Sequence, residues 1–396
     1  MSAVLDAHVM ATYARYPLTL ERGEGMRVRD EQGRWFLDFA GALGAASLGH
    51  GHPRWIAAVH EQVDVLTMVS NLYATRPQSR LADLLAEELP IPDAQAFFAN
   101  SGAEANEAAL KLARKHGLAR GRPRIVALDG SFHGRSVATL AATGQPGKRE
   151  AFEPLVDWFD HVPPDDHDAL DTAVDERTAA VLLEPVMGEG GVIPLAHDYL
   201  RAARTLCDER GALLIADEVQ SGLGRCGDWL AGSDAGVVPD VVSLAKGLGG
   251  GLPIGACVAP ARIAFGRGEH ASTFGAGPVP CAAGVAVVET IRDEGLLGNA
   301  RSRGEQIRER LESIVGTSPL ASVRGRGLLV GVVLDRPAAH EVALAMIERG
   351  VLVSEAGPDV VRLSPPLIAS AEDVDEALDA LTEVLAQARD SVGSSA

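Results

Sequence analysis

The sequence predicts an α/β protein in which a large domain with a mostly parallel sheet is joined to a smaller α+β domain. From about residue 94 to residue 290, short apolar segments alternate with helical patterns, as in parallel strands connected by helices. The segments TAAVLLEPV (178–186) and ALLIADEV (212–219) are almost continuously apolar, which is typical of strands buried on both faces. After about residue 291 the pattern changes, and the chain length also favours a second domain.

Local patterns predict the individual elements in order. The segment 26–40 reads as a hairpin, because EQG separates two strand-like stretches. The helical segment 198–211 should end at Gly211, since glycine readily adopts the left-handed conformation that closes a helix. Further strands are expected at 96–100, 124–130, 240–246 and 254–260, with a helix at 104–117. Beyond residue 291 we expect two long helices, a strand pair at 324–335 and a last helix from about 371.

The composition excludes several classes of protein. The net charge of −18 disfavours a nucleic-acid-binding protein, because phosphate contacts require a basic surface. The four cysteines show no C-x-x-C spacing, so we expect no zinc site, no disulfide framework and no other metal site. No signal-peptide pattern opens the chain, and no apolar run approaches the ~18 residues of a membrane span. We therefore expect a cytoplasmic protein without a membrane segment.

Polar or glycine-rich residues follow five of the predicted strands at their carboxyl ends. Ligands of open α/β sheets bind at this edge, so the sequence predicts that the five places form one site. They are SGAEAN after FFAN, SFHGR after LDG, MGEGG after LLEPV, EVQSG after IAD and KGLGG after SLA.

The segment after the first of these strands has the features of an anion site. Ser101 can cap a helix whose first turn contains Gly102 and Ala103. Small residues there leave backbone N–H groups open, and a helix N-terminus favours a negative charge. An ordinary helix cap without a ligand explains the same pattern.

Three other strand ends carry reactive or planar groups. Phe132 and His133 offer flat rings, and Arg135 offers a planar fork for a carboxylate; a core phenylalanine and a solvated arginine are the alternative. Asp217 directly follows a buried strand, so its carboxylate needs a partner, either a structural cation or a protonated ring nitrogen. Lys246 stands among apolar and glycine residues, where its amine is either solvated or kept neutral as a nucleophile.

Together these groups match the requirements of pyridoxal phosphate. This cofactor needs a lysine for its aldehyde, an acid against its ring nitrogen, an anion site for its phosphate and a platform for its ring. Lys246, Asp217, the helix start at Ser101 and Phe132 supply them in turn. The conjunction at successive strand ends predicts an enzyme that depends on this cofactor.

Two motifs have other interpretations. GLGRCG (222–227) matches G-x-G-x-x-G, but a nicotinamide-dependent oxidoreductase needs a helix after it, and the glycine- and proline-containing segment that follows predicts none. GHGHP (49–53) has two histidines without further ligands, so a turn is expected. A non-catalytic cofactor-binding protein is the third alternative, and two arginines suited to carboxylates, Arg135 and Arg362, argue against it.

The assembled motifs resemble those of the class III (subgroup II) pyridoxal-phosphate aminotransferases. The resemblance spans nearly the whole chain, through LDFAGALGAASLGHGHP, FFANSGAEANEAALKLAR, LLEPVMGEGGV, IADEVQSGLGRCG, LAKGLGGGLPIGA and VVRLSPPL. It implies the fold-type I architecture and a homodimer with shared active sites. It also implies an N-terminal segment (1–60) that joins the small domain and the dimer contacts, a large cofactor-binding domain (61–290) and a C-terminal small domain (291–396).

The resemblance also implies a role for each matching position. Lys246 would bind the cofactor aldehyde and move protons, and Asp217 would hold the ring nitrogen protonated. Phe132 and Val219 would cover the two ring faces, and Gln220 would lie near the ring hydroxyl. The other implied cofactor contacts are Ser101, Gly102, Ala103, His133 and, from the partner subunit, Thr273.

The implied substrate contacts are four. Arg135 would hold a substrate carboxylate, Arg362 would hold the α-carboxylate of the keto acid or glutamate, and Ser272 would lie near the substrate. Glu189 would pair with Arg362 when the amine donor is bound, so that one pocket accepts two unlike substrates.

The resemblance points to N2-acetylornithine as amine donor and 2-oxoglutarate as acceptor, a reaction of arginine biosynthesis. The alternative donors are ornithine, N-acetyllysine, succinyldiaminopimelate and 4-aminobutyrate. Two departures affect this choice: Met187 replaces the usual glutamine, and Ala276 and Gly277 replace the usual glycine and asparagine. We expect Met187 to remove a polar group near the cofactor or substrate.

Overall fold

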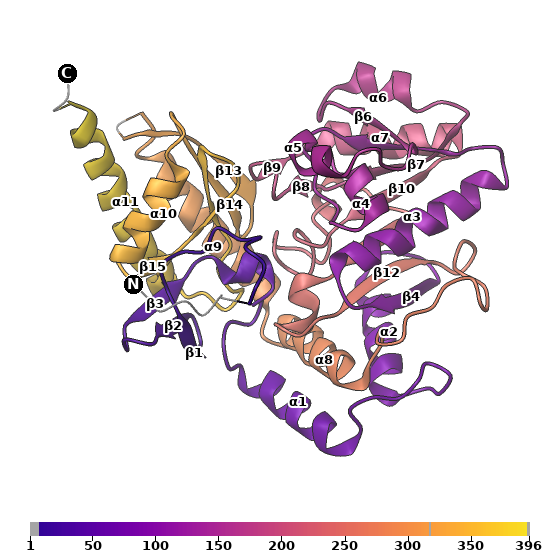
Figure 1. Cartoon of the computed structure of the whole chain (residues 1–396), viewed down its shortest axis with the longest axis horizontal. Coiled ribbons are helices and arrows are strands. Elements are labelled where there is room, and N and C mark those ends of the chain that lie inside the picture. Colours follow the sequence, from indigo (N-terminus) through magenta and orange to yellow (C-terminus); the bar gives the residue numbers. More distant parts are fainter. Residues whose placement is uncertain (1–7, 317, 394–396) are drawn as a thin grey trace.

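A seven-stranded sheet organises the larger half of the molecule, at the right in Figure 1. The computed structural model describes residues 8–316 and 318–393. Across the sheet the strands are β4 (Ala94–Ala99), β12 (Gly255–Pro260), β11 (Val241–Leu244), β10 (Leu213–Asp217), β7 (Thr178–Leu183), β5 (Arg124–Leu128) and β6 (Phe159–Val162). β12 is antiparallel to both neighbours, and the other pairings are parallel, which confirms the mostly parallel sheet.

Helices cover both faces of this sheet. Ile125 and Leu182 pack in one cluster with α3 (Gly102–Leu118), while their neighbours Val126 and Leu183 pack in another with α7 (His197–Arg210). Both faces of the central strands are therefore apolar, which explains why their sequences lack the alternation of half-exposed strands. α7 ends at Gly211 in the left-handed conformation, as predicted.

Shorter elements complete this half. None of the helices that the structure describes is both long and apolar enough to cross a membrane. The helices are α1 (Pro53–Val65), α2 (Arg76–Glu88), α4 (Val137–Ala142), α5 (Pro146–Arg149), α6 (His167–Ala173) and α8 (Pro278–Asp293), with the short strands β8 (Val186–Met187) and β9 (Ile193–Pro194) and the 3-10 turns η2 (Glu150–Phe152), η3 (Ser233–Ala235) and η4 (Lys246–Gly249).

The smaller half combines both ends of the chain, so that indigo and yellow segments meet at the left of Figure 1. The predicted hairpin, β2 (Arg27–Asp30) and β3 (Trp35–Asp38), forms a sheet with β1 (Leu20–Glu24) and with β15 (Val351–Leu352). A second sheet contains β13 (Leu320–Arg326), β14 (Leu329–Leu334), β17 (Val360–Leu363) and β16 (Ser354–Glu355). The remaining elements are η1 (Gly41–Gly44), α9 (Leu296–Glu312), α10 (Ala339–Glu348) and α11 (Ala371–Gly393).

The predicted order of elements needs one correction after residue 291. Only α9 precedes the strand pair, and the second expected helix, α10, follows it and has 10 residues. A continuous apolar run predicts the strand pair, whereas the sequence between this pair and the last helix mixes short strands with a short helix. The proposed domain limits at residues 60 and 291 stay a prediction.

Candidate active site

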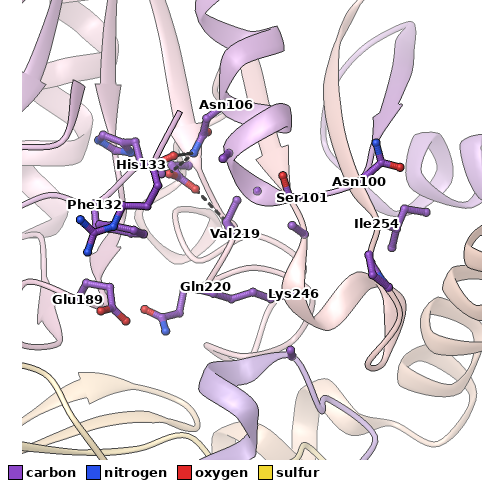
Figure 2. A pocket seen from close by; sticks show the side chains of 18 of the residues that line it. Asn100, Ser101, Asn106, Phe132, His133, Glu189, Val219, Gln220, Lys246 and Ile254 are labelled. Carbon is purple, nitrogen blue, oxygen red and sulfur yellow. Dashed lines mark hydrogen bonds and ion pairs between the residues drawn. The ribbon is translucent and has the colours of Figure 1, made fainter. Parts of the chain in front are cut away.

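A cavity of about 440 Å³ opens at the carboxyl ends of the large sheet. The prediction that the strand ends converge is confirmed, because residues following β4, β5, β7, β10 and β11 line the same cavity. Of the predicted site residues, the lining includes Ser101, Gly102, Ala103, Phe132, His133, Arg135, Glu189, Asp217, Val219, Gln220 and Lys246. Figure 2 shows several of these side chains around one space.

Asp217 lies at the end of β10, almost fully buried and surrounded by donors. Its Oδ2 accepts a hydrogen bond from Asn106 Nδ2 at 2.7 Å and lies 2.8 Å from His133 Nδ1, while its Oδ1 accepts from Val219 N at 3.1 Å. A buried carboxylate is stable only when such partners compensate its charge. The network holds Asp217 in place as a negatively charged group at the cavity wall.

Lys246 follows β11 and reaches the cavity from the opposite side of Gln220 to Glu189 (Figure 2). Its φ of 44° is in the left-handed region, which is unfavourable for a residue with a Cβ and is typical of functional sites. Its amine makes no hydrogen bond or ion pair within the residues that the structure describes. Burial lowers the pKa of Lys246, although the carboxylate of Glu189 opposes this effect. The site therefore favours a neutral, nucleophilic amine.

The start of α3 forms another wall. Ser101 is the N-cap, as predicted, and its hydroxyl accepts a hydrogen bond from Glu104 N at 3.2 Å. A Cβ at position 102 would lie 2.7 Å from the Val219 side chain, so only glycine lets the helix and Val219 approach this closely. The open N–H groups of Gly102 and Ala103 can hold an anion there.

Phe132 and Arg135 lie together beside this wall. The Arg135 guanidinium is 5.6 Å from the centre of the Phe132 ring, and Lys148 Nζ is 4.9 Å from it. Phe132 N donates a 2.7 Å hydrogen bond to Glu184, which fixes the backbone that carries both predicted residues. The arrangement places two cations near an aromatic platform, where an anionic substrate can bind.

Arg362 and Glu189 form the ion pair that the resemblance implies. Arg362 Nη1 lies 2.6 Å from Glu189 Oε1 and donates to Gly188 O at 3.0 Å, and its Nε donates to Ser354 Oγ at 3.1 Å. Burial alone would raise the pKa of Glu189, but the charge of Arg362, its hydrogen bond to the carboxylate and the nearby Lys246 and Lys148 together outweigh burial and lower this pKa. Glu189 therefore masks an almost fully buried cation at the edge of the cavity.

Three predicted residues are not among those that line this cavity, and one of them, Arg362, is next to it through its ion pair with Glu189. Ser272 and Thr273 line a different hollow with Asn71 and Phe274, and Ser272 Oγ accepts from Gly275 N at 2.9 Å. Within one chain, therefore, the structure does not place Ser272 or Thr273 beside Lys246.

The expectation for Met187 is wrong. Its side chain is 1% exposed and packs in the apolar cluster with Leu195 and Tyr199, and it does not line the cavity. Met187 is thus a core residue in this chain. Ala276 adopts a left-handed φ of 62°, where the glycine usual in the family is unstrained, and Gly277 caps α8.

Sequence reasoning missed two residues of the site. Asn106 lies in the first turns of α3 and donates a hydrogen bond to Asp217. A single amide side chain on an otherwise apolar helix face is the sequence feature that indicates such a buried contact. Glu184 follows β7 and accepts hydrogen bonds from Phe132 N and from Gly188 N. Burial, reinforced by the charge of Asp217, raises the pKa of Glu184 to about 7.

The GLGRCG motif forms no dinucleotide-binding turn and helix. GLGRCG forms turns between β10 and β11, and within the described residues only the three-residue 3-10 turn η3 separates it from β11, as predicted. No cluster of metal-ligating side chains occurs in the described parts of the chain. The four cysteines are free and buried.

The cavity fits pyridoxal phosphate. Its volume is within the range of small-ligand sites, and it combines an amine, a carboxylate, a ring platform and a helix N-terminus. His133 Nε2 and Gln220 Oε1 belong to residues that line it and have no hydrogen-bond partner in the described structure. Lys246, Asp217, Phe132 and the first turn of α3 would hold the cofactor.

Comparisons with known proteins identify the family of this chain. The family model for class III aminotransferases matches residues 9–385. The acetylornithine aminotransferase of Gloeobacter violaceus is 48% identical over 388 residues, covering 96% of both chains, and that of Streptomyces coelicolor is 48% identical over 383 residues, covering 96% of this chain and 94% of that protein.

Solved structures of two relatives superpose closely. The ornithine aminotransferase from Toxoplasma gondii, whose structure has partial occupancy of PLP in the active site, gives a TM-score of 0.93 at 31% identity, covering 97% of this chain and 93% of that one. The N-acetylornithine aminotransferase from Stenotrophomonas maltophilia gives a TM-score of 0.83 at 35% identity, covering 96% and 98%.

The fold and these relationships define a pyridoxal-phosphate-dependent transferase of fold type I. Within this class, the chain belongs to the class III aminotransferases.

Proposed function

We propose that this enzyme transfers the δ-amino group of N2-acetyl-L-ornithine to 2-oxoglutarate, forming N-acetyl-L-glutamate 5-semialdehyde and L-glutamate in arginine biosynthesis. The relatives that are named acetylornithine aminotransferases support the choice of substrate. The observation that carries the proposal is the Glu189–Arg362 pair, 2.6 Å long, beside the cavity of Lys246. A maskable cation suits a pocket that alternates between a monocarboxylate amine and a dicarboxylate.

Each group has a chemical task in this proposal. Pyridoxal phosphate supplies an aldehyde that takes up the amine and a ring that withdraws electrons from the reacting carbon. The Lys246 amine, once free, would remove a proton from that carbon of the amine donor and deliver a proton to the former aldehyde carbon of the cofactor, which leaves the amino group on the cofactor. The Asp217 carboxylate keeps a proton on the ring nitrogen, because Asn106, His133 and Val219 maintain its negative charge.

The two arginines bind carboxylates in turn. Arg135 binds the carboxylate far from the reacting carbon, since its planar fork matches two oxygens. Arg362 binds the second carboxylate of 2-oxoglutarate or glutamate after Glu189 has moved away. When the acetylated donor is bound, the Glu189 carboxylate stays on Arg362 and hides its charge.

We also propose a homodimer with shared active sites. The apolar side chains of Leu72, Tyr73 and Phe274 are 89%, 67% and 66% exposed in one chain. Two of them, Leu72 and Phe274, line the same hollow as Thr273. Covering this surface with a second copy would remove apolar area from water and bring Thr273 to the partner's phosphate site. The free cysteines favour a reducing, cytoplasmic location.

A panel of amine donors tests the substrate. Each of N2-acetylornithine, ornithine, N-acetyllysine, succinyldiaminopimelate and 4-aminobutyrate is assayed with 2-oxoglutarate as acceptor. We expect kcat/KM for N2-acetylornithine to exceed the others by about tenfold or more, a difference of ~1.4 kcal/mol in transition-state binding. A higher kcat/KM for another donor would identify that amine as the substrate instead.

A further inference from the structure

Residues Gly41–Gly44 form one turn of left-handed backbone beside the candidate active site. Their φ angles are 52°, 49°, 58° and 91°, and two of the four, Ala42 and Leu43, carry a Cβ. Left-handed backbone is unfavourable for such residues, and several in succession are rare. The surrounding structure must therefore hold the turn, and strain of this kind is commonly found where geometry serves function.

Two groups hold the turn from outside. Asp38 Oδ1 accepts hydrogen bonds from Ala40 N at 3.1 Å and Gly41 N at 2.8 Å, and its Oδ2 lies 2.9 Å from His50 Nε2. Ser364 Oγ donates to Ala40 O at 2.8 Å. Packing is tight, because a Cβ on Gly41 would lie 2.2 Å from Ser364 O. His50, the first histidine of GHGHP, thus belongs to the support of this turn.

The turn holds the side chain of Gln220 through a backbone carbonyl. Leu43 O accepts a hydrogen bond from Gln220 Nε2 at 3.2 Å. Gln220 Oε1 is pressed against Gly188, where a Cβ would lie 1.4 Å from it. An amide side chain can otherwise rotate to exchange its oxygen and nitrogen, but here the carbonyl of Leu43 accepts only the nitrogen. In Figure 2 this amide lies between Glu189 and Lys246.

We propose that the left-handed turn Gly41–Gly44, held by the Asp38–His50 pair, is a positioning element that fixes the orientation of the Gln220 amide. One N–H of Gln220 bonds Leu43, and the second is thereby available to the ring oxygen of the cofactor. This inference rests on the proposed function, in which Gln220 lies near that oxygen. A donor at this place stabilises the oxygen as an anion, so its loss weakens cofactor binding and raises the pH at which the visible band of the loaded enzyme titrates.

The test compares Gly41→Ala, Gln220→Leu and the double variant. The readouts are the dissociation constant of the cofactor from the apo-enzyme and the pH midpoint of the visible band. We expect each single variant to weaken cofactor binding about tenfold, the value of one lost charge-assisted hydrogen bond, and to raise the midpoint. The double variant should lose no more than the worse single variant, because both changes break the same link. Gly33→Ala is the matched control: it has a positive φ of 84° but no atom within 4 Å of the added Cβ, so neither readout should change.

A milder variant covers the case in which Gly41→Ala does not fold. Asp38→Asn keeps the side-chain size and an acceptor oxygen but removes the carboxylate oxygen that faces His50 Nε2. We expect cofactor binding about threefold weaker, and no further loss in the Gln220→Leu background. Losses that multiply with Gln220→Leu, or wild-type readouts in both turn variants, would overturn the inference. A wild-type enzyme without a visible band that depends on Lys246 would instead refute the proposed function, and this inference with it.

Discussion

Glu189 and Arg362 are the residues in which the two-substrate mechanism is most easily tested. Glu189→Gln keeps the shape and a hydrogen-bond acceptor but leaves the charge of the buried Arg362 uncompensated. Without the negative charge of Glu189 beside it, the Arg362 cation should continue to bind the dicarboxylate and should disfavour the acetylated donor. We expect kcat/KM for the amine half-reaction to fall about tenfold and that for 2-oxoglutarate to change little. Stopped-flow measurement of the two half-reactions checks this, and an equal loss in both would contradict the masking role.

Glu218 makes stability depend on pH. Its carboxyl is buried and accepts hydrogen bonds from Ser221 Oγ and Gly232 N, and burial raises its pKa from 4.5 to about 7. An acid with a raised pKa in the folded state binds more protons there than when unfolded. Its stabilising contribution is therefore complete below pH 4.5 and is lost as the pH rises toward 7, by up to ~3 kcal/mol.

Glu218→Gln tests this dependence, because it keeps a polar side chain and removes the titration. Urea unfolding of the apo-enzyme at about pH 5 and pH 8 should show a smaller decrease in the free energy of unfolding for the variant than for the wild type. Glu184, whose pKa is raised to about 7 by burial, preserves part of the decrease in both proteins. An identical decrease in the two proteins would show that Glu218 does not titrate in this range.

At the scale of elements, the N-terminus of α3 is the proposed phosphate site. Ala103→Asp places a negative charge in its first turn, which favours the helix dipole by ~0.5 kcal/mol but repels a phosphate. We expect unchanged or higher stability of the apo-enzyme together with cofactor binding at least about tenfold weaker. Ala103→Asn has the same size without the charge and is the control. Fluorescence titration measures the cofactor affinity of both variants. Equal affinities would show that the phosphate does not bind at the N-terminus of α3.

The sequence predicts those elements and site residues that have a local pattern of their own. The buried strands, the Gly211 helix end, the Ser101 cap and the convergence of strand ends each follow from a local pattern combined with the topology of parallel sheets. The antiparallel direction of β12 was not predictable, because its apolar sequence looks the same in either direction. The placement of Met187 in the core also required the packing of β8 against α7.

The Gly41–Gly44 turn illustrates the same limit. Ala42 and Leu43 carry no signal for left-handed backbone. Their conformation depends on the packing of Ser364, far away in the sequence, together with the neighbouring Asp38. Long-range contacts also pair the N-terminal hairpin with β15. Both features depend on tertiary structure, which local propensity does not report.

For the molecule as a whole, the proposed dimer makes activity depend on the oligomeric state. Leu72 is 89% exposed in one chain, and its neighbour Asn71 donates hydrogen bonds to Ser272 O and Gly275 O, in the loop that carries Thr273. Leu72→Arg should produce monomers, because it places a charge in an apolar contact, and should reduce kcat/KM at least about tenfold. Leu118→Arg, at the exposed end of α3, is the control. Sedimentation velocity measures the mass, and a fully active monomer would exclude shared sites.

The proposed function depends above all on a covalent bond between Lys246 and the cofactor. Borohydride reduction of the enzyme loaded with pyridoxal phosphate makes this link permanent, and mass spectrometry of the digested protein then locates it. We expect the added mass on the peptide that contains Lys246 and no added mass in the Lys246→Ala variant. A modification on Lys148 or another lysine instead, or none at all, would show that Lys246 does not bind the cofactor.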